Sequence, residues 1–370
     1  MGQRLLILDG CESRARILEA PLTLNLDETS GWRVHDVLSH RFDTDEPCSL
    51  SIRTLRTNSS VIEIEGRQYP GVLELVPIET ISPGAVSSSI RSVDLVTRIA
   101  MESYIPGVLD GELYGHWPVT TFQAQAVAAR SYAVAEHAYW SDRRHFDLVS
   151  GPASQVWNGI DVSEIARSAA ESTRGIVLVH EGRVVPAYYS SCCGGMPASA
   201  FQAISARTTH EIPPLQPRLS PQPCCEASPV RSWELRYSLE DVASAVRESD
   251  PKENFGRLNT IRISKRNPAG RPLEYILRDQ ANRSISMSAR RFRSMLAQLR
   301  PLGRTEPVIP KSEAMEPRVA DGALVILGRG FGHGVGLCQY GARARAEAGD
   351  AWEEIVLRYY PEAGLVRSWK

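Results

Sequence analysis

A glycine-rich stretch near the C-terminus, residues 328–344 (GRGFGHGVGLCQYGARA), most constrains how this chain can fold. Its glycines stand at 328, 330, 332, 334, 336 and 341, and they surround a single histidine, His333. Glycine this dense weakens helices and strands alike, so a folded domain keeps it where the backbone must bend or a ligand must come close. An alanine-rich run at helical spacing follows. The stretch therefore predicts either a tight turn packed against a helix or an imidazole exposed to a bound ligand.

Changes in the hydrophobic pattern divide the chain and predict an α+β fold. Residues 1–95 carry short apolar or alternating runs between polar segments, which predicts a β-rich N-terminal part with strands at RLLIL, SLSIRTL, SVIEIEG and GVLELVPI. Residues 96–139 switch to helical spacing, with one helix expected over 96–109 and a second from Pro118 onward. The remainder of the region 96–370 is expected to contain strands and a cysteine-bearing loop at 174–310, then the glycine-rich loop and helices at 328–360.

Charge and hydropathy exclude some classes of partner. The chain has 42 basic and 43 acidic residues in 370, so its overall charge gives no sign of a nucleic-acid or acidic-lipid partner. No apolar run reaches the ~18 residues that a membrane-spanning helix needs. The N-terminus resembles a first strand and not a signal peptide, so we expect either a cytosolic chain or a missing start and export signal.

The cysteines are unevenly placed. Two adjacent pairs, Cys192-Cys193 and Cys224-Cys225, stand about 30 residues apart with His210 between them, while Cys11, Cys48 and Cys338 are scattered. The spacing differs from the CxxC pattern of many zinc sites, so the pairs are compatible with a thiolate zinc site, with disulfides or with buried thiols.

Glu112 is the best candidate for acid–base chemistry. It follows Gly111 in what we expect to be a turn between two apolar helices, beside Leu113, Tyr114 and Trp117. An apolar, aromatic setting raises the pKa of a carboxyl group toward the range useful for a general acid. A solvated turn glutamate is the alternative, and Asp110 is a candidate second acid.

Gln123 and Arg130 stand seven residues apart on the second predicted helix, so they share one face. A buried arginine on that face would need a carboxylate or a ligand to meet its charge.

Several long motifs occur in a fixed order along the chain and resemble the stage II sporulation protein D family, which includes the amidase-enhancer proteins of bacterial cell walls. They are MESYIPGVLDGELYGHWPVTTFQAQAVAARSYA, SQVWNG, TRGIVLVHEGRVVPAYYSSCCGG, GRGFGHGVGLCQYGARARA and IVLRYYPEA. The resemblance covers roughly residues 4 to 365. The family's glutamate is kept at Glu112, although both prolines of the family's P-x-E-M-P motif are lost. Ser131 replaces a threonine of the family. Cys193 and Cys225 match family cysteines, Cys192 and Cys224 are additions, and Ser190 replaces a histidine.

The resemblance implies a lytic transglycosylase that acts on peptidoglycan glycan strands in the cell envelope, with 96–370 as its catalytic region. It implies Glu112 as the single catalytic acid and base, without a cofactor in the chemistry. Substrate would be held by residues of the shared motifs and the helix face described above: Gln123, Arg130, Gln155, His333, Gln339 and Tyr340. A structural zinc at Cys192, Cys193, Cys224 and Cys225 would then have to replace the missing imidazole with a thiolate.

Two other functions are compatible with the same motifs. One is a non-catalytic protein of the amidase-enhancer kind, which binds glycan or a cell-wall amidase. The other is a carbohydrate-binding module, for which Trp117, Trp157 and Tyr340 could stack on sugar rings. A glutamine at position 112 should be tolerated by an enhancer and not by an enzyme.

Overall fold

The computed structural model describes residues 4–369 apart from 12–13, 28–30, 37, 55–60, 65–66, 81–88, 218–224 and 250–253. The chain forms two compact units, residues 1–112 with 136–171 and residues 113–135 with 172–370. Each has a hydrophobic core of its own, and each combines helices with strands, which confirms the predicted α+β class. This division is based on contacts between residues. The boundary predicted near residue 95 is based on secondary structure, and it stays a prediction.

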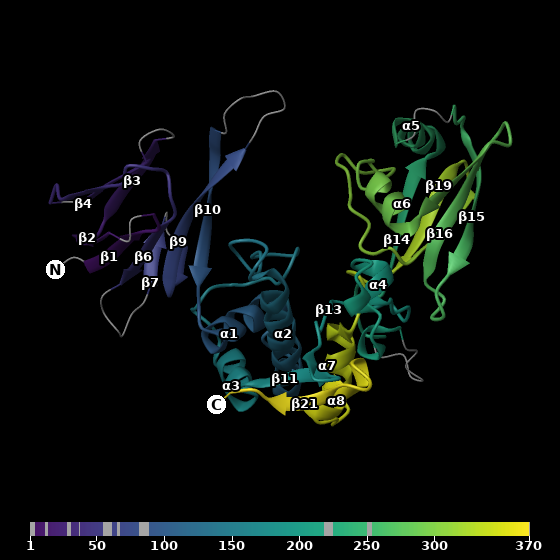
Figure 1. The fold of residues 1–370 in the computed structure, drawn as a ribbon. Coiled ribbons are helices and arrows are strands. Elements are labelled where there is room, and N and C mark those ends of the chain that lie inside the picture. The colour runs from purple at the N-terminus through teal and green to yellow at the C-terminus, as the bar shows by residue number, and fades with distance from the viewer. Residues whose placement is uncertain are drawn as a thin grey trace. The chain divides into compact units, whose positions relative to one another are not determined.

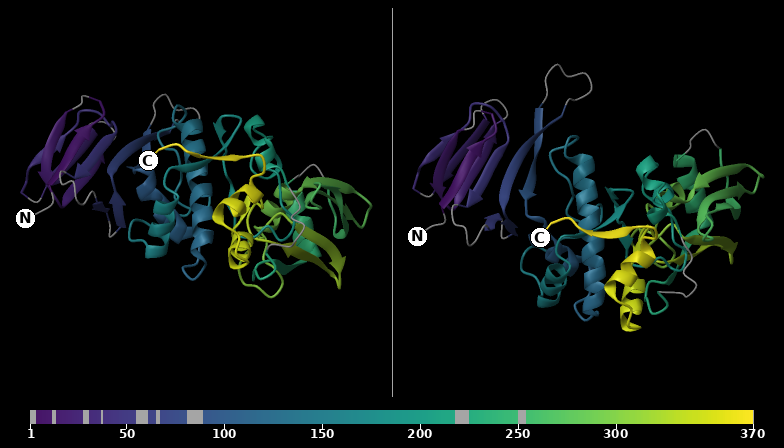
Figure 2. Two further views of the ribbon diagram at one scale, coloured as in Figure 1. Left: turned by 90° about the horizontal axis from the view of Figure 1, so that it is seen from below. Right: turned by 60° about the horizontal axis from the view of Figure 1, so that its bottom comes forward.

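The first unit begins with antiparallel strands. A five-stranded sheet has the order β10-β9-β6-β1-β2, and β3, β4 and β5 form a second sheet (Figure 1). Both views of Figure 2 show β9 and β10 running side by side as long strands. The strands are β1 (Arg4–Asp9), β2 (Ala15–Glu19), β3 (Leu22–Asp27), β4 (Gly31–Asp36), β5 (Arg41–Asp43), β6 (Leu50–Thr54), the hairpin β7 (Val61–Ile64) and β8 (Arg67–Pro70), β9 (Val72–Thr80) and β10 (Ser89–Arg98).

Alternating burial shows why these segments pair as strands. In β1, Leu5 and Ile7 are buried, and in β4, Trp32 and Val34 are buried, at every second position in each case. One face of each strand thus contributes to a shared apolar core. The runs RLLIL, SLSIRTL, SVIEIEG and GVLELVPI, expected as strands, are confirmed as β1, β6, β7 and β9 within the described residues.

The helices that follow differ from the prediction at one end. The helix expected over 96–109 is α1 (Met101–Glu112), because residues up to Arg98 extend β10, where Val96 pairs with Glu74 of β9. Strand pairing therefore overrides the local helical spacing at 96–98. The expected second helix is confirmed as α2 (Val119–Trp140), and α3 spans Glu164–Ser172.

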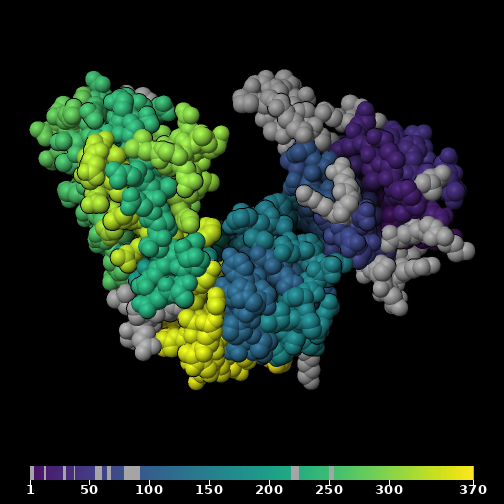
Figure 3. Space-filling view, turned by 180° about the vertical axis from the view of Figure 1, so that it is seen from behind, coloured from purple at the N-terminus to yellow at the C-terminus, as the bar shows by residue number. Residues whose placement is uncertain are grey.

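The second unit is built around antiparallel sheets with helices packed against them. The sheets β14-β19-β18 and β15-β16-β17 enclose a core together with α5 and α6. Figure 3 shows the other side of this layer, where lime to yellow residues lie among green ones. The elements are β14 (Ser232–Ser238), α5 (Leu239–Ser249), β15 (Leu258–Arg266), β16 (Pro272–Asp279), β17 (Ser284–Ser288), α6 (Ala289–Leu296), β18 (Met315–Ala320) and β19 (Ala323–Arg329).

Short strands join distant segments of the second unit. β11 pairs with both β12 and β21, and β13 runs parallel to β20, directly before α7 (Figure 1). The bounds are β11 (Ile176–His180), β12 (Arg183–Val184), β13 (Tyr189–Ser190), α4 (Ala200–Ala203), β20 (Leu337–Cys338), α7 (Gln339–Glu347), α8 (Trp352–Tyr359) and β21 (Gly364–Arg367), with 3-10 turns at Thr208–His210 and Pro213–Leu215.

The glycine-rich stretch is confirmed as a turn region followed by a helix, with one change. Gly328 and Arg329 belong to β19, and the loop itself starts at Gly330. In the part of the chain that the structure describes, no helix is long and apolar enough to cross a bilayer.

Candidate functional site

In the first unit, residues 154–159 lie along α1 on a face that carries two glycines. A Cβ atom added at Gly107 would stand 2.2 Å from the carbonyl oxygen of Gly159, and one at Gly111 would stand 2.6 Å from that of Val156. Because the two glycines are four residues apart, they lie on one face of the helix. A side chain at either position would push the 154–159 segment away from the helix. The two glycines therefore allow this segment to reach the C-terminal end of α1.

Glu112 is the last residue of α1, whereas the sequence predicts it in a turn. Its carboxylate Oε1 accepts a hydrogen bond of 2.9 Å from the backbone N–H of Val156. The side chain is half-buried, and the next residue, Leu113, is buried. The helix end and the 154–159 segment together hold the carboxyl group while leaving part of it open.

Gln155 lies in the same segment and is fully buried. Its Oε1 accepts a hydrogen bond of 3.1 Å from the hydroxyl of Tyr104 on α1, and Trp157 stacks on the Tyr104 ring at a centroid distance of 6.4 Å. The indole N–H of Trp157 is buried and has no hydrogen-bond partner among the described residues. The structure thus brings Gln155 and Trp157 onto the helix that ends at Glu112.

Asp110 has a different role from the second acid considered above. Its carboxylate accepts hydrogen bonds from both the backbone N–H and the hydroxyl of Ser163, at 2.5 and 2.6 Å. The Ser163 hydroxyl in turn accepts from the N–H of Ala166 at 3.3 Å, in the first turn of α3. Asp110 therefore fixes the start of α3 to the end of α1.

In the second unit, Gln123 and Arg130 both reach the segment 172–176, which agrees with a shared helix face. The Gln123 amide donates to the hydroxyl of Ser172 at 3.0 Å. Arg130 is fully buried, and its Nη1 donates to the carbonyl oxygen of Ile176 at 3.2 Å. The Gln123 contact ties α2 to the last residue of α3, and the Arg130 contact ties α2 to the strand β11, so Arg130 also serves the packing of the unit.

His333 lies in the glycine-rich loop and is neutral at pH 7. Burial, and then the charge of Arg271, lower the pKa of His333 to about 4, against a hydrogen bond to the Tyr189 backbone that raises it. Its Nδ1 accepts from the N–H of Val335 at 3.0 Å. The ring packs edge-on against Tyr188 at 6.0 Å. The imidazole is thus held in one orientation and can donate through Nε2.

An aromatic cluster of Tyr114, Trp117 and Tyr340 lies in the second unit. The rings of Trp117 and Tyr340 are 4.9 Å apart, those of Tyr114 and Trp117 are 5.4 Å apart, and the Arg343 guanidinium lies 5.4 Å from the Trp117 ring. Trp117 is buried, while Tyr114 is 57% exposed. Burial, followed by the neighbouring Tyr114, raises the pKa of Tyr340. The cluster offers a ring surface to solvent directly after Glu112 in sequence. Gln339, beside Tyr340, is buried.

A buried thiol cluster connects three distant segments of the second unit. The Sγ atoms of Cys192, Cys225 and Cys338 lie within 4.8 Å of one another, and Cys193 Sγ is 3.9 Å from Cys225 Sγ. All four are buried free thiols. Hydrogen bonds from Cys225, then from Cys338, lower the pKa of Cys192 to about 3, although burial opposes this.

The glycine-rich loop helps to build this thiol cluster. The N–H of Phe331 donates to the carbonyl oxygen of Cys192 at 2.8 Å, and the N–H of Cys192 donates to that of Phe331 at 3.1 Å. Cys338 comes from β20, which pairs with β13 just before Cys192. Cys338 has no signal in the cysteine spacing, and only its place in the glycine-rich motif could have indicated it.

Two other residues were considered as metal ligands, Cys224 and His210, which lies between the cysteine pairs in sequence. Cys224 lies outside the described residues. The two ring nitrogens of His210 are engaged elsewhere, with the Tyr188 hydroxyl at 3.0 Å and the Ser205 carbonyl oxygen at 2.9 Å. His210 is therefore a buried residue held by Tyr188 and Ser205, and it is not part of the described thiol cluster.

The predicted site residues are divided between the units. Glu112 and Gln155 lie together in the first unit, and Gln123, Arg130, His333, Gln339 and Tyr340 lie in the second. A cleft that joins Glu112 to Arg130 and His333 stays a prediction.

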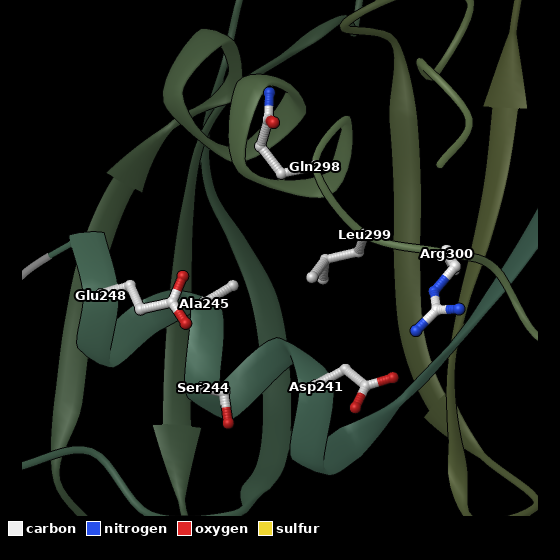
Figure 4. Close-up of a pocket in the computed structure, with 7 residues that line it drawn as sticks. All are labelled: Asp241, Ser244, Ala245, Glu248, Gln298, Leu299 and Arg300. Carbon is white, nitrogen blue, oxygen red and sulfur yellow. The ribbon is translucent and has the colours of Figure 1, made fainter. Parts of the chain in front are cut away.

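A cavity of about 240 Å³ elsewhere in the second unit contains none of these residues. Figure 4 shows its side chains standing apart from one another, on α5 and on the segment 298–300. Its lining comprises Asp241, Ser244, Ala245, Glu248, Gln298, Leu299 and Arg300. Because most of these side chains are exposed and none converge, the cavity is no candidate for the chemistry.

Known proteins match this chain over long stretches. The family model described as Stage II sporulation protein, SpoIID, matches residues 89–180, which contain Glu112, Arg130 and Gln155. An uncharacterized protein of Brachyspira hyodysenteriae is 26% identical over 82% of this chain and 73% of the relative.

Relatives with descriptive names match this chain as well. The Amidase enhancer of Bacillus subtilis is 26% identical over 70% of this chain, and the match spans 40% of that longer protein. The Stage II sporulation protein D of Bacillus amyloliquefaciens is 24% identical over 75% of this chain and 78% of the relative.

Proposed function

Because this chain belongs to the stage II sporulation protein D family, we propose that it is a lytic transglycosylase that acts on the glycan strands of peptidoglycan. One observation carries the proposal. Glu112 is a half-buried carboxyl group held at a helix end by a backbone N–H, and it is followed in sequence by the exposed Tyr114 and the buried Trp117 of the aromatic cluster. A cell-envelope location outside the cytoplasm follows from this substrate.

A single carboxyl group is sufficient for this reaction because the nucleophile belongs to the substrate. Protonated Glu112 would donate its proton to the glycosidic oxygen between N-acetylmuramic acid and N-acetylglucosamine, and the bond from that oxygen to C1 would break. The 6-hydroxyl of the same N-acetylmuramic acid would attack C1, and Glu112 would accept the hydroxyl proton. The products are a 1,6-anhydro end and a new 4-hydroxyl, with no water consumed and the acid regenerated.

The other predicted residues would position the glycan. Tyr114, Trp117 and Tyr340 provide aromatic faces of the kind on which sugar rings stack. His333, neutral and oriented, would donate a hydrogen bond, and the glycines beside it permit close approach. Gln123 would contribute an amide contact, and the buried Gln155 and Gln339 would support the substrate-binding residues from behind. Arg130, which is buried, would support the site from within the unit.

We further propose a structural zinc ion in the thiol cluster. Tetrahedral zinc with Zn–S bonds of about 2.3 Å places sulfur atoms about 3.8 Å apart. The Sγ atoms of Cys192, Cys225 and Cys338 lie within 4.8 Å of one another and are buried, which suits such an ion. Cys193, 3.9 Å from Cys225, is the nearest described candidate for a fourth ligand. A disulfide between Cys193 and Cys225 is the alternative use of these thiols. Bound zinc would fix the three segments to one another and would take no part in the cleavage.

A second function has support from one relative, which is named an Amidase enhancer and matches at the same 26% identity as the uncharacterized protein. In that case the chain would bind glycan or a cell-wall amidase without cleaving the strand. Glu112 distinguishes the two functions, because binding alone does not require an acid at that position.

The test is digestion of purified peptidoglycan, intact and stripped of stem peptides, followed by mass spectrometry of 1,6-anhydro products. We expect the wild type to release them and Glu112→Gln to lower the rate by roughly 10²- to 10⁴-fold. Glu164→Gln is the matched control, since that side chain is 89% exposed in the same unit. Equal rates for wild type and Glu112→Gln would refute the role of this residue. Wild-type protein that releases no anhydro ends but stimulates an amidase would favour the second function.

A further inference from the structure

Cys11 and Cys48, which look scattered in the sequence, face each other across two neighbouring strands. β1 and β6 pair antiparallel with Leu5 opposite Thr54 and Asp9 opposite Leu50. Continuing this register by two residues past the strand ends places Cys11 opposite Cys48. The N–H of Gly10 donates to the carbonyl oxygen of Ser49 at 2.8 Å, so the pairing does continue beyond the assigned strands.

The position of this hydrogen bond determines the geometry of the two cysteines. Because Gly10 and Ser49 form a hydrogen-bonded pair, the next pair, Cys11 and Cys48, is of the non-hydrogen-bonded kind. Such pairs have Cα atoms about 4.5 Å apart and side chains on the same face. That separation falls in the range of about 4.4–6.8 Å that disulfides adopt.

The thiols themselves lie near each other and are accessible. Hydrogen bonding to Cys48 is the largest cause that raises the pKa of Cys11, which requires the two side chains to be close together. Cys11 is exposed and Cys48 is half-buried, and both line a cavity of about 160 Å³ with Asp9, Arg14, Thr44, Asp45 and Glu46. The Cys48 carbonyl oxygen accepts from the indole N–H of the buried Trp32 at 2.7 Å, which fixes the backbone there.

From the register, the proximity and the accessibility, we propose that Cys11 and Cys48 are a thiol pair that oxidises to a disulfide. One thiolate attacks a low-molecular-weight disulfide, forming a mixed disulfide and releasing one small thiolate. The second thiolate then attacks the mixed disulfide, forming the Cys11–Cys48 bond and releasing the other. The protein loses two protons and two electrons, and the oxidising disulfide is reduced to two thiols.

The bond would enclose a large part of the N-terminal sheets. Strands β2, β3, β4 and β5 all lie between the two cysteines in sequence. Closing a loop of this length restricts the unfolded chain, so the oxidised form should be the more stable one. This inference is independent of the proposed enzymatic function, because it concerns only the first unit.

The experiment compares the full chain kept reduced with the chain treated with oxidised glutathione at about pH 8.5. After blocking free thiols and digesting with trypsin, the peptides 5–14 and 42–53 should be joined, with a mass lower by two hydrogens than their sum. Thermal unfolding should occur several degrees higher in the oxidised chain. Cys48→Ser, a conservative change, should lose both the joined peptide and the shift.

Absence of the joined peptide from the oxidised wild type would overturn the proposal. A joined peptide found only in the reduced sample would also overturn it. The same conclusion would follow if the unfolding midpoint of Cys48→Ser equalled that of the oxidised wild type. Cys11→Ser provides a second variant if Cys48→Ser fails to fold, because Cys11 is exposed at a chain turn.

Discussion

The two thiol sites of this chain contain the same residue type in opposite surroundings. Cys11 lies among Asp9, Asp45 and Glu46 at the solvent-exposed end of a sheet. The hydrogen bond to Cys48, followed by burial and nearby negative charges, raises the pKa of Cys11 to about 11. In the second unit, hydrogen bonds from Cys225 and then Cys338 lower the pKa of the buried Cys192 to about 3.

The difference shows that the environment of a cysteine, and not its exposure, decides its chemistry. The hydrogen bond to Cys48, together with burial and the acidic neighbours, favours the neutral thiol of Cys11, which exchanges slowly near neutral pH. Converging sulfur donors favour a thiolate, which is the form that binds zinc. We therefore expect the exposed pair to form its disulfide slowly near neutral pH and the buried cluster to hold metal, although exposure alone would suggest that the exposed thiols react fast.

The largest expected effect comes from removing a thiol of the buried cluster. Cys225→Ser should abolish bound zinc and lower the unfolding midpoint of the purified protein by roughly 10 °C, because a structural metal contributes directly to folding. Elemental analysis with differential scanning calorimetry measures both. Cys48→Ser is the matched control and should leave the zinc content unchanged. If the wild type contained no zinc and its cluster cysteines reacted as free thiols in denaturant, the expected difference between the two sites would be wrong. Both sites would then contain ordinary thiols.

The second effect tests whether the glycine-rich loop holds the buried cluster in place. A Cβ added at Gly330 would stand 2.4 Å from the Cys192 carbonyl oxygen, and its φ is +75°. Gly303 has a φ of +78° with nothing within 4 Å of an added Cβ, so it serves as the control. Gly303→Ala should cost about 1 kcal/mol of unfolding free energy, and Gly330→Ala about 3 kcal/mol or more, because a backbone clash is added to the shared strain.

Denaturant unfolding of both variants, with zinc content as a second readout, checks this expectation. Equal stability of Gly330→Ala and Gly303→Ala would show that the loop can move away from Cys192 at no cost. The thiol cluster would then be held by its own side chains alone, and the loop would have no structural part in the site.

Local sequence patterns predicted much of the fold. Alternation at Leu5 and Ile7 identified β1, and the helical spacing after Pro118 identified α2. The helix start was wrong at 96–98 because pairing between β10 and β9 decides that segment, and such pairing depends on residues about 20 positions away. Glu112 was singled out as a candidate by its motif, and its role stays a prediction, whereas its place at the end of a helix was not predicted.

The thiol sites show where sequence reasoning ends. The approach of Cys193 to Cys225 was expected from the motifs, and their Sγ atoms are 3.9 Å apart. Cys338 joins the buried cluster, and Cys11 lies opposite Cys48, because strands from remote segments pair with each other. The spacing of the cysteines in the sequence does not encode this pairing. Arg130 was expected to need a carboxylate or a ligand, and the structure gives it the backbone carbonyl oxygen of Ile176.

The smallest expected effect concerns the acidic residues around the exposed pair. Glu46→Gln removes one of the negative charges that raise the pKa of Cys11, so a larger fraction of the thiol is ionised at any given pH. Formation of the joined 5–14 and 42–53 peptides with oxidised glutathione should then be about two- to threefold faster at pH 8. In the wild type the rate should rise roughly tenfold per pH unit between about pH 7 and 10, because that range lies below the raised pKa of about 11. Glu164→Gln, far along the chain and highly exposed, should leave the rate unchanged. Two results would show that the carboxylates do not control the reactivity of Cys11: a rate in Glu46→Gln equal to that of the wild type, or a pH profile that levels off near pH 8. The contrast between the two thiol sites would then depend on sulfur contacts alone.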